Sequence, residues 1–332
     1  MSQPDALSGD TPQLSVLIIG YRMPEALANT LVSFGPDYQQ GVDVSDYEVV
    51  IVENRSEECI PEAVINSLPR SFHYFLRTND SVSPVSAIEF GLERCRGKYL
   101  GLVIDGAQLV TPGVLRLVLD ILTEERNALI AVPGYHLGEV EQHKVDDNEL
   151  LYRQQTEFLQ SINWQEDGYR LFEWACFSPG NRRGYLQPMM ECSAFFCSRA
   201  LFDRVAPVDR RFQYPGGGSI NLHMYRLLGL QRDTKLFVLP GEGTFHQYHG
   251  GVTTRSSQKM DEQLARFKSQ LQEIWGNKFN ALRREPKLRG TVGAYARPFE
   301  ELSEKRAERW RLNAKFLGKP LWEDDLPENL LD

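Results

Sequence analysis

Short apolar runs alternate with amphipathic segments along the first 133 residues of the chain. The apolar runs have the length of strands and occupy residues 14–21, 47–54, 72–79, 98–105 and 129–133. Continuous runs of this kind suit strands that are buried on both faces, as in a parallel sheet. Between them, apolar residues recur at helical spacing over 24–34, 61–68, 86–94 and from Thr111, which we expect to cap its helix. The alternation predicts an α/β fold with a mostly parallel, Rossmann-like sheet flanked by helices.

The alternation ends after Pro133. Residues 136–190 are polar and aromatic without a strong period, and residues 177–188 combine glycine, proline and two adjacent arginines, which is typical of a long loop. A strand is predicted from Glu191, a helix after the glycines at 216–218, and a further strand from Lys235. From Ser256 onward, charges at helical spacing predict a C-terminal extension of two or three helices.

The predicted organisation therefore has four parts. We expect a disordered N-terminus over 1–12, a ligand-binding subdomain over 13–135, a second, catalytic subdomain over 136–255, and the helical extension over 256–332.

Composition narrows the class of protein. The 332 residues are 42% hydrophobic and 25% charged, and the net charge of −8 argues against a nucleic-acid partner that is bound through its phosphates. Five cysteines without paired spacing indicate reduced thiols. The polar start resembles no signal peptide, and the apolar run over 99–110 is interrupted by Asp105 and too short for a transmembrane segment. We therefore expect a cytoplasmic protein.

Ligands of parallel sheets bind outside the carboxyl ends of the strands. In this chain those positions are Gly20, Tyr21, Arg22, Glu53, Asn54, Arg77 and Asp105. The carboxylate of Glu53 can accept hydrogen bonds from a nucleobase or a ribose, although it can equally serve the helix that follows. Asp105 follows a strongly apolar strand, where an acid is costly unless it is solvated, paired or bound to a metal. We favour a functional role for Asp105.

Basic side chains and histidines supply further candidates. Arg22, Arg77, Arg182 and Arg183 fall in predicted loops, where a guanidinium group suits phosphate, although a lone arginine is more often surface charge. His246 and His249 stand three residues apart beside two glycines, and they suit either a divalent metal or a diphosphate.

Two glutamates are candidates for a general base. Glu191 precedes an apolar strand, so burial is expected to raise its pKa toward neutrality, and Glu173 is the second candidate.

Four segments, in this order, resemble the nucleotide-diphospho-sugar glycosyltransferases of the A fold, family 2. They are SVLIIGYRMPEALANTLVSF, EVVIVENRSEE, RGKYLGLVIDGAQLVTPGVL and SAFFCSRALFDRVAPVDRRF, and the likeness covers roughly residues 13–250. The resemblance implies the glycosyltransferase A fold, with Tyr21 and Glu53 at the nucleobase and ribose and Asp105 as first acid of the metal motif. The last acid of that motif falls on Ala107, and the Glu-Asp pair that usually holds the base falls on Gly218–Ser219.

The resemblance implies an inverting transfer of a sugar from a nucleotide-diphosphate donor to an acceptor hydroxyl on a glycan or small molecule, as in polysaccharide biosynthesis. The leaving group needs positive charge. Either Mn²⁺ or Mg²⁺ on Asp105 with His246 or His249, or Arg182 and Arg183 with the histidines, can supply that charge. The helical extension would help to form a homodimer or shape the acceptor cleft. Two alternatives remain. One is a catalytically inactive nucleotide-sugar-binding protein. The other is a nucleotidyltransferase, which would normally carry a glycine-rich basic loop after the first strand, and the segment GYRMPEA of this chain matches such a loop poorly.

Overall fold

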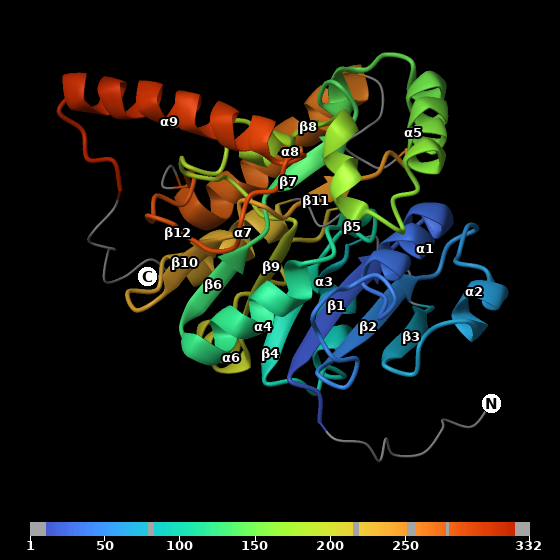
Figure 1. Ribbon diagram of the computed structural model, residues 1–332. Helices are drawn as coiled ribbons and strands as arrows, with labels where there is room; N and C mark the ends of the chain where they lie inside the picture. The colour runs from blue at the N-terminus through green and yellow to red at the C-terminus, as the bar shows by residue number, and fades with distance from the viewer. Residues whose placement is uncertain (1–10, 79–82, 215–218, 251–256, 277–278, 323–332) are drawn as a thin grey trace.

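The computed structural model describes residues 11–78, 83–214, 219–250, 257–276 and 279–322 (Figure 1). Ten of the twelve residues predicted to form a disordered N-terminus lie outside these ranges, as do the glycines at 216–218.

A mostly parallel sheet forms the centre of the molecule, as the sequence predicts. In the described ranges it has eight strands in the order β12-β10-β6-β9-β4-β1-β2-β3. The strands are β1 (Leu14–Gly20), β2 (Tyr47–Asn54), β3 (Phe72–Arg77), β4 (Tyr99–Val103), β6 (Ala128–Ala131), β9 (Ala194–Ser198), β10 (Lys235–Val238) and β12 (Lys287–Leu288). Only β9 is antiparallel to its neighbours, β4 and β6. Because β4, β1 and β2 are parallel neighbours, their carboxyl ends lie at the same edge of the sheet.

Helices cover both faces of this sheet, which explains the continuous apolar runs. Leu17 and Ile19 of β1 belong to the core on one face, and Val16 and Ile18 to the core on the other. The first face packs against α3 (Val85–Leu92), α6 (Arg199–Val205) and α7 (Ile220–Gly229). The second packs against α1 (Pro24–Ser33), α4 (Val114–Glu124) and the short α2 (Glu62–Asn66). Successive residues of a strand point to opposite faces, so a strand covered on both sides must be apolar throughout.

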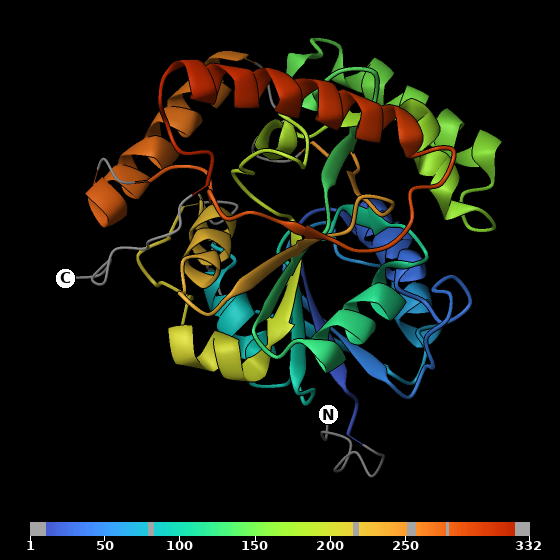
Figure 2. The ribbon, with the colours of Figure 1, turned by 60° about the vertical axis from the view of Figure 1, so that its left-hand side comes forward.

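A second, smaller sheet stands above the carboxyl edge of the first (Figures 1 and 2). It has the order β5-β11-β7-β8, with β5 (Gln108–Val110), β11 (Thr244–His246), β7 (Gly134–Leu137) and β8 (Ala175–Phe177). Helix α5 (Asn148–Ile162) and three short 3₁₀ turns (Gln142–Lys144, Gly168–Trp174 and Pro179–Asn181) follow β7. The sequence predicted none of these four strands and did not predict α5. Strands of three or four residues are too short to show a period, and Gln155 occupies a buried position of α5 where an apolar residue would have marked the helix.

The C-terminal extension contains two long helices, α8 (Ser257–Trp275) and α9 (Arg297–Phe316), as predicted. Helix α9 lies across the second sheet (Figure 2), where the ring centroid of Phe299 is 4.8 Å from that of Tyr135. The extension also supplies an edge strand that the sequence did not predict, because β12 pairs with β10.

One helix cap differs from the prediction. The residue that caps α4 is Gly113, not Thr111. The hydroxyl of Thr111 instead donates to Oε2 of the buried Glu242 at 2.5 Å. The start of α4 is itself buried, and the N–H of Leu115 donates there to Oε1 of Gln39 at 3.1 Å. The hydroxyl of Thr111 pairs instead with the buried carboxylate, so tertiary contacts decide its position.

The described helices include none with the length and apolar character that a membrane crossing requires.

A buried carboxylate ties β1, β2 and the turn before β4 together. Glu48 accepts hydrogen bonds from Oγ of Ser15 at 2.6 Å and from the backbone N–H of Arg96 at 2.7 Å. The guanidinium of Arg96 and the ring of His73 also face it. Burial alone would raise the pKa of Glu48, but the hydrogen bonds from His73, Ser15 and Arg96 outweigh burial and lower the pKa to about 2.

Glu48 should therefore contribute stability at neutral pH that is lost in acid. Because its pKa in the folded chain is lower than in the unfolded chain, the contribution is present above the unfolded pKa of about 4.3 and disappears as the pH falls toward 2. We expect Glu48→Gln to lower the free energy of unfolding by roughly 2–3 kcal/mol at pH 7 and by about half as much at pH 3. Urea unfolding at both pH values measures this, with the exposed Glu62→Gln as control. An equal loss at both pH values would contradict the prediction.

Candidate functional site

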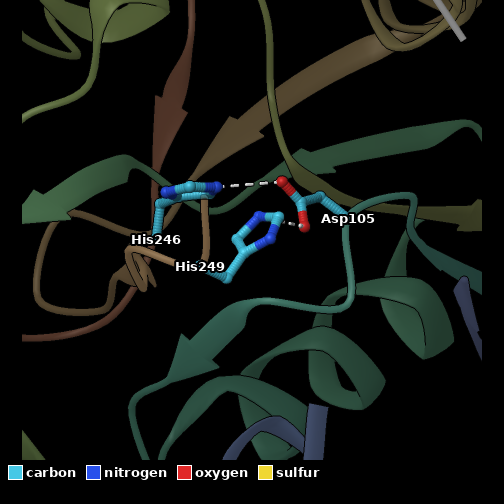
Figure 3. A group of neighbouring side chains, drawn as sticks. All are labelled: Asp105, His246 and His249. Carbon is cyan, nitrogen blue, oxygen red and sulfur yellow. Dashed lines mark hydrogen bonds and ion pairs between the residues drawn. The ribbon is translucent and has the colours of Figure 1, made fainter. Parts of the chain in front are cut away.

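Asp105, His246 and His249 form a compact cluster at the carboxyl edge of the large sheet (Figure 3). Nε2 of His246 is 3.0 Å from Oδ2 of Asp105, and Nε2 of His249 is 3.8 Å from Oδ1. One ligand atom from each of the three side chains lies within 4.8 Å of the others. The sequence predicted these three residues as metal ligands, and the structure brings them together.

Strand pairing explains how residues 141 positions apart meet. The turn after β4 folds against β1, because the N–H of Gly106 donates to the carbonyl of Ile19 at 2.8 Å. Strand β5 follows at once, and β11 pairs with it antiparallel so that His246 stands opposite Gln108. The N–H of Gln247 then donates to the carbonyl of Ala107 at 2.8 Å. This register leaves His246 beside Asp105.

The side-chain amide of Gln142 fixes the tautomer of His246. Its Nε2 donates to the carbonyls of His246 and Leu137 at 2.8 and 3.2 Å, so its Oε1 faces Nδ1 of His246 as an acceptor at 2.6 Å. Nδ1 must therefore carry a proton. The other ring nitrogen, Nε2, then points a lone pair at a carboxylate oxygen, and that contact is favourable only with a proton or a metal ion between the two atoms.

The electrostatic environment favours an ionised Asp105 and a neutral His249. Burial alone would raise the pKa of Asp105, but His246 and His249 outweigh it and lower the pKa below its usual range. Burial lowers the pKa of His249, against the opposing effect of Asp105. An ionised carboxylate beside a neutral imidazole is the state that binds a metal ion.

Glu191 interacts electrostatically with His246 and Asp105 and is held by two asparagines. Nδ2 of Asn221 donates to its Oε2 at 3.0 Å, and Nδ2 of Asn181 donates to its backbone carbonyl at 3.0 Å. A Cβ on Gly180 would come within 2.1 Å of Cγ of Glu191, so glycine is needed there. Burial raises the pKa of Glu191, the bond from Asn221 partly offsets this, and His246 and Asp105 act on it with opposite signs.

The first two strands place their predicted residues at the same edge. Gly20 stands opposite Glu53 in the register, and a Cβ on Gly20 would lie 2.8 Å from Leu27. Both carboxylate oxygens of Glu53 receive the N–H of Ile60, at 3.3 and 3.2 Å, and Oε2 also accepts the hydroxyl of Tyr74 at 2.6 Å. Glu53 is fully buried, and burial raises its pKa. It therefore holds the segment before α2, the structural role that the sequence left open.

Asn54 and Tyr21 offer polar groups at this edge. Oδ1 of Asn54 is buried and has no hydrogen-bond partner among the described residues. Tyr21 is half-buried. These two side chains, more than Glu53, could accept new contacts from a ligand.

The predicted phosphate-binding arginines lie in four different settings. Arg22 has a positive φ of 57° and lies 3.8 Å from Glu57. The guanidinium of Arg77 lies over the ring of Phe90 at 5.1 Å. Arg182 forms two hydrogen bonds with Glu141, at 2.5 and 2.8 Å, and Arg183 is exposed. None of the contacts found among the described residues joins these guanidinium groups to the Asp105 cluster.

Glu173, the second candidate base, forms a two-pronged ion pair with Arg170, at 2.7 and 3.2 Å. In the described ranges, no hydrogen bond or ion pair links it to Asp105, His246 or His249. Glu191 differs from Glu173 in that its carboxylate interacts electrostatically with His246 and Asp105.

Sequence reasoning missed four residues that support the cluster: His136, Gln142, Asn181 and Asn221. Nδ1 of His136 accepts the N–H of Gln142 at 3.0 Å, and its ring centroid is 5.3 Å from that of His246. Burial lowers the pKa of His136, so its ring is neutral. Of these four residues, only His136 could have been found from the sequence, because it is a histidine close to the end of a predicted strand. Nothing in the sequence distinguished the three amides.

Comparison with known proteins gave fold-level likenesses only. No protein-family model matches the sequence, and no curated protein matches it. Among solved structures, S. aureus TarS aligns over 93% of this chain with 13% identity and a TM-score of 0.44. The chain spans 46% of the TarS chain. TarS 1-349 in complex with UDP-GlcNAc aligns over 93% of this chain and 76% of its own, with 13% identity and a TM-score of 0.46. Because both TM-scores are below 0.5, we base the functional proposal on the side chains of this chain.

The raised pKa of Glu191 should make it a cost to stability at neutral pH. Because the folded chain holds this proton more tightly than the unfolded chain, stability is lost as the pH rises from the unfolded pKa through the folded pKa. We expect Glu191→Gln, which can still accept from Asn221, to raise the melting temperature at pH 7.5 and to leave it nearly unchanged at pH 4. The exposed Glu301→Gln serves as control. A variant that melts lower than the native chain at pH 7.5 would contradict the prediction.

Proposed function

We propose that the chain is a metal-assisted glycosyltransferase, which moves a sugar from a nucleotide-diphosphate donor to an acceptor hydroxyl with inversion. The observation that carries the proposal is the cluster of Asp105, His246 and His249 at the carboxyl edge of a parallel sheet, with Glu191 close enough to interact with it electrostatically. Parallel sheets bind nucleotides at this edge.

The residues of the cluster fit a divalent cation. They offer one carboxylate oxygen and two imidazole nitrogens, a mixed set that suits Mn²⁺ better than Mg²⁺, which prefers oxygen ligands. Three protein ligands leave coordination positions for the diphosphate oxygens of the donor. A cation bound there supplies the positive charge that stabilises the leaving nucleoside diphosphate.

The absence of an acid at position 107 has a structural reason. The side chain of Ala107 is fully buried in the core that α1 and α4 cover, so it does not face the cluster. Its N–H donates to Oδ1 of Asp105 at 3.1 Å and helps to orient that carboxylate. His246 and His249 then supply, from another segment, the ligands that a second acid would otherwise provide.

Glu191 is our candidate for the general base. Its carboxylate would take the proton of the acceptor hydroxyl as the new bond from that oxygen to the anomeric carbon forms. The bond from the anomeric carbon to the diphosphate oxygen breaks in the same step, and both electrons leave with the diphosphate. A single displacement of this kind inverts the anomeric centre. Burial brings the pKa of Glu191 closer to the operating pH, which favours general-base catalysis, and Asn221 orients the carboxylate.

A protein that binds a nucleotide sugar without turning it over is the second candidate. Ser219, at a position where the glycosyltransferases that the sequence resembles have an acid, is buried and is the N-cap residue of α7. The neighbouring Gly218 lies outside the described residues. This alternative shares the binding step with the transferase and lacks the transfer.

We expect nucleoside diphosphates to bind more tightly when Mn²⁺ is present. Titration calorimetry with UDP, GDP and dTDP, each with and without Mn²⁺, identifies the base. Asp105→Asn should weaken Mn²⁺-dependent binding at least tenfold, because it removes the charged ligand. The control is Asp120→Asn, on the surface of α4. Equal binding by both variants, or binding that EDTA leaves unchanged, would show that Asp105 holds no metal.

Transfer should depend on Glu191 more than binding does. Glu191→Gln is expected to lower kcat for release of nucleoside diphosphate from the donor by roughly 10²–10⁴-fold and to change nucleotide affinity less than threefold. Glu173→Gln is the matched control, because that carboxylate belongs to an ion pair with Arg170. A larger loss of kcat in Glu173→Gln than in Glu191→Gln would show that Glu173, and not Glu191, is the general base. Nucleotide binding without release or transfer in the native chain would favour the inactive binding protein.

A further inference from the structure

A groove of about 900 Å³ runs between α1 and α5, on the side of the Asp105 cluster where His249 lies. One wall is the start of α1 together with the preceding turn, and the other is one face of α5 along its length. The floor is the segment that follows β11, with Gln247, Tyr248 and His249. The groove is large enough for a ligand of several sugar units.

The α5 wall is unusual for a helix that faces another helix. Residues on that face recur three, four or seven positions apart, which is the spacing of one helix face. They are mostly uncharged hydrogen-bonding residues: Asn148, Tyr152, Gln155, Thr156, Gln160 and Asn163. A face that packs directly against α1 would be apolar. This face of α5 instead lines an open space between α5 and α1.

The charges of the groove argue against an anionic ligand. The groove is lined by three carboxylates, those of Glu25, Glu58 and Glu149, and by one guanidinium, that of Arg22. The guanidinium of Arg22 already lies 3.8 Å from the carboxylate of Glu57. A phosphate or nucleotide would meet net repulsion here. The groove is therefore distinct from the place where the donor diphosphate would bind.

The floor is rigid, and one polar atom of the wall is unsatisfied. Nε2 of Gln247 donates to the carbonyl of Ala26 at 2.9 Å, and Oε1 of Gln155 accepts the N–H of Tyr248 at 2.6 Å. Oδ1 of Asn148 is buried without a hydrogen-bond partner in the described part of the chain. The hydroxyl of Tyr152 donates to Glu25 and links the two walls.

We infer that this groove binds a neutral saccharide. Carboxamides and hydroxyls that both donate and accept match sugar hydroxyls, and three carboxylates against one guanidinium disfavour a phosphate. The apolar residues of the lining, Met23, Pro24, Ala26, Leu159 and Trp164, are outnumbered by polar ones, which disfavours a lipid. This step rests on the proposed function: we identify the saccharide as the acceptor. The reason is that the groove reaches His249, which belongs to the cluster that would hold the donor.

The test uses the full chain without nucleotide or metal. Saturation-transfer NMR with maltotriose, cellotriose, mannotriose and chitotriose should show binding of at least one neutral trisaccharide. Gln160→Trp, which fills the groove, should weaken that binding at least tenfold. Gln154→Trp makes the same change at an exposed position of α5 that does not line the groove, and should change binding less than twofold.

Three outcomes would overturn the inference: no trisaccharide binds, the two variants lose binding equally, or only the anionic control sialyllactose binds. Calorimetry with the nucleotides on the same samples separates this test from that of the proposed function. Saccharide binding without nucleotide binding would refute the transferase and leave a saccharide site. Nucleotide binding that survives in Gln160→Trp, together with lost saccharide binding, would establish two separate sites.

Discussion

The pairing of β11 with β5 is the constraint on which the site depends. Asp105 lies two residues past the end of β4 in the large sheet, and β5 begins three residues after it, at Gln108. Strand β11 reaches β5 after more than a hundred residues and pairs with it antiparallel, with His246 opposite Gln108. A slip of one residue would turn His246 to the other face of the small sheet and remove it from Asp105. The aromatic contacts of Phe245 with Tyr135 and Phe172, at 5.3 and 4.9 Å between ring centroids, hold this register.

Around that register, hydrogen bonds determine which form of His246 faces Asp105. Gln142 uses its amide nitrogen on two carbonyls, so its oxygen must accept from Nδ1 of His246. Asp105 therefore meets the basic nitrogen, and the pair is stable only with a cation between them. A proton satisfies this requirement as an ion pair, and a metal ion satisfies it as a binding site. The side chain of Asp105 is 38% exposed, so a ligand from solution can reach it.

The sequence predicted the large sheet well because burial on both faces leaves an unmistakable apolar run. It predicted Asp105, His246 and His249 because costly residue types stood at strand ends. It could not predict their support, since Gln142, Asn181 and Asn221 are ordinary amides whose value lies in contacts across the chain. Glu53 shows the opposite limit: its position at a strand end suggested a ligand, yet the N–H of Ile60 and the hydroxyl of Tyr74 already occupy its oxygens. Position along a strand does not reveal whether an oxygen is already engaged.

The segment from Phe245 to His249 links features that look separate in the sequence. Phe245 packs in the small sheet, His246 meets Asp105, and Gln247 bonds to Ala107 and Ala26. Through Ala26 the segment is fixed to α1, and through Tyr248 it is fixed to Gln155 of α5. Both walls of the groove are thus anchored to the five residues that carry both histidines of the cluster.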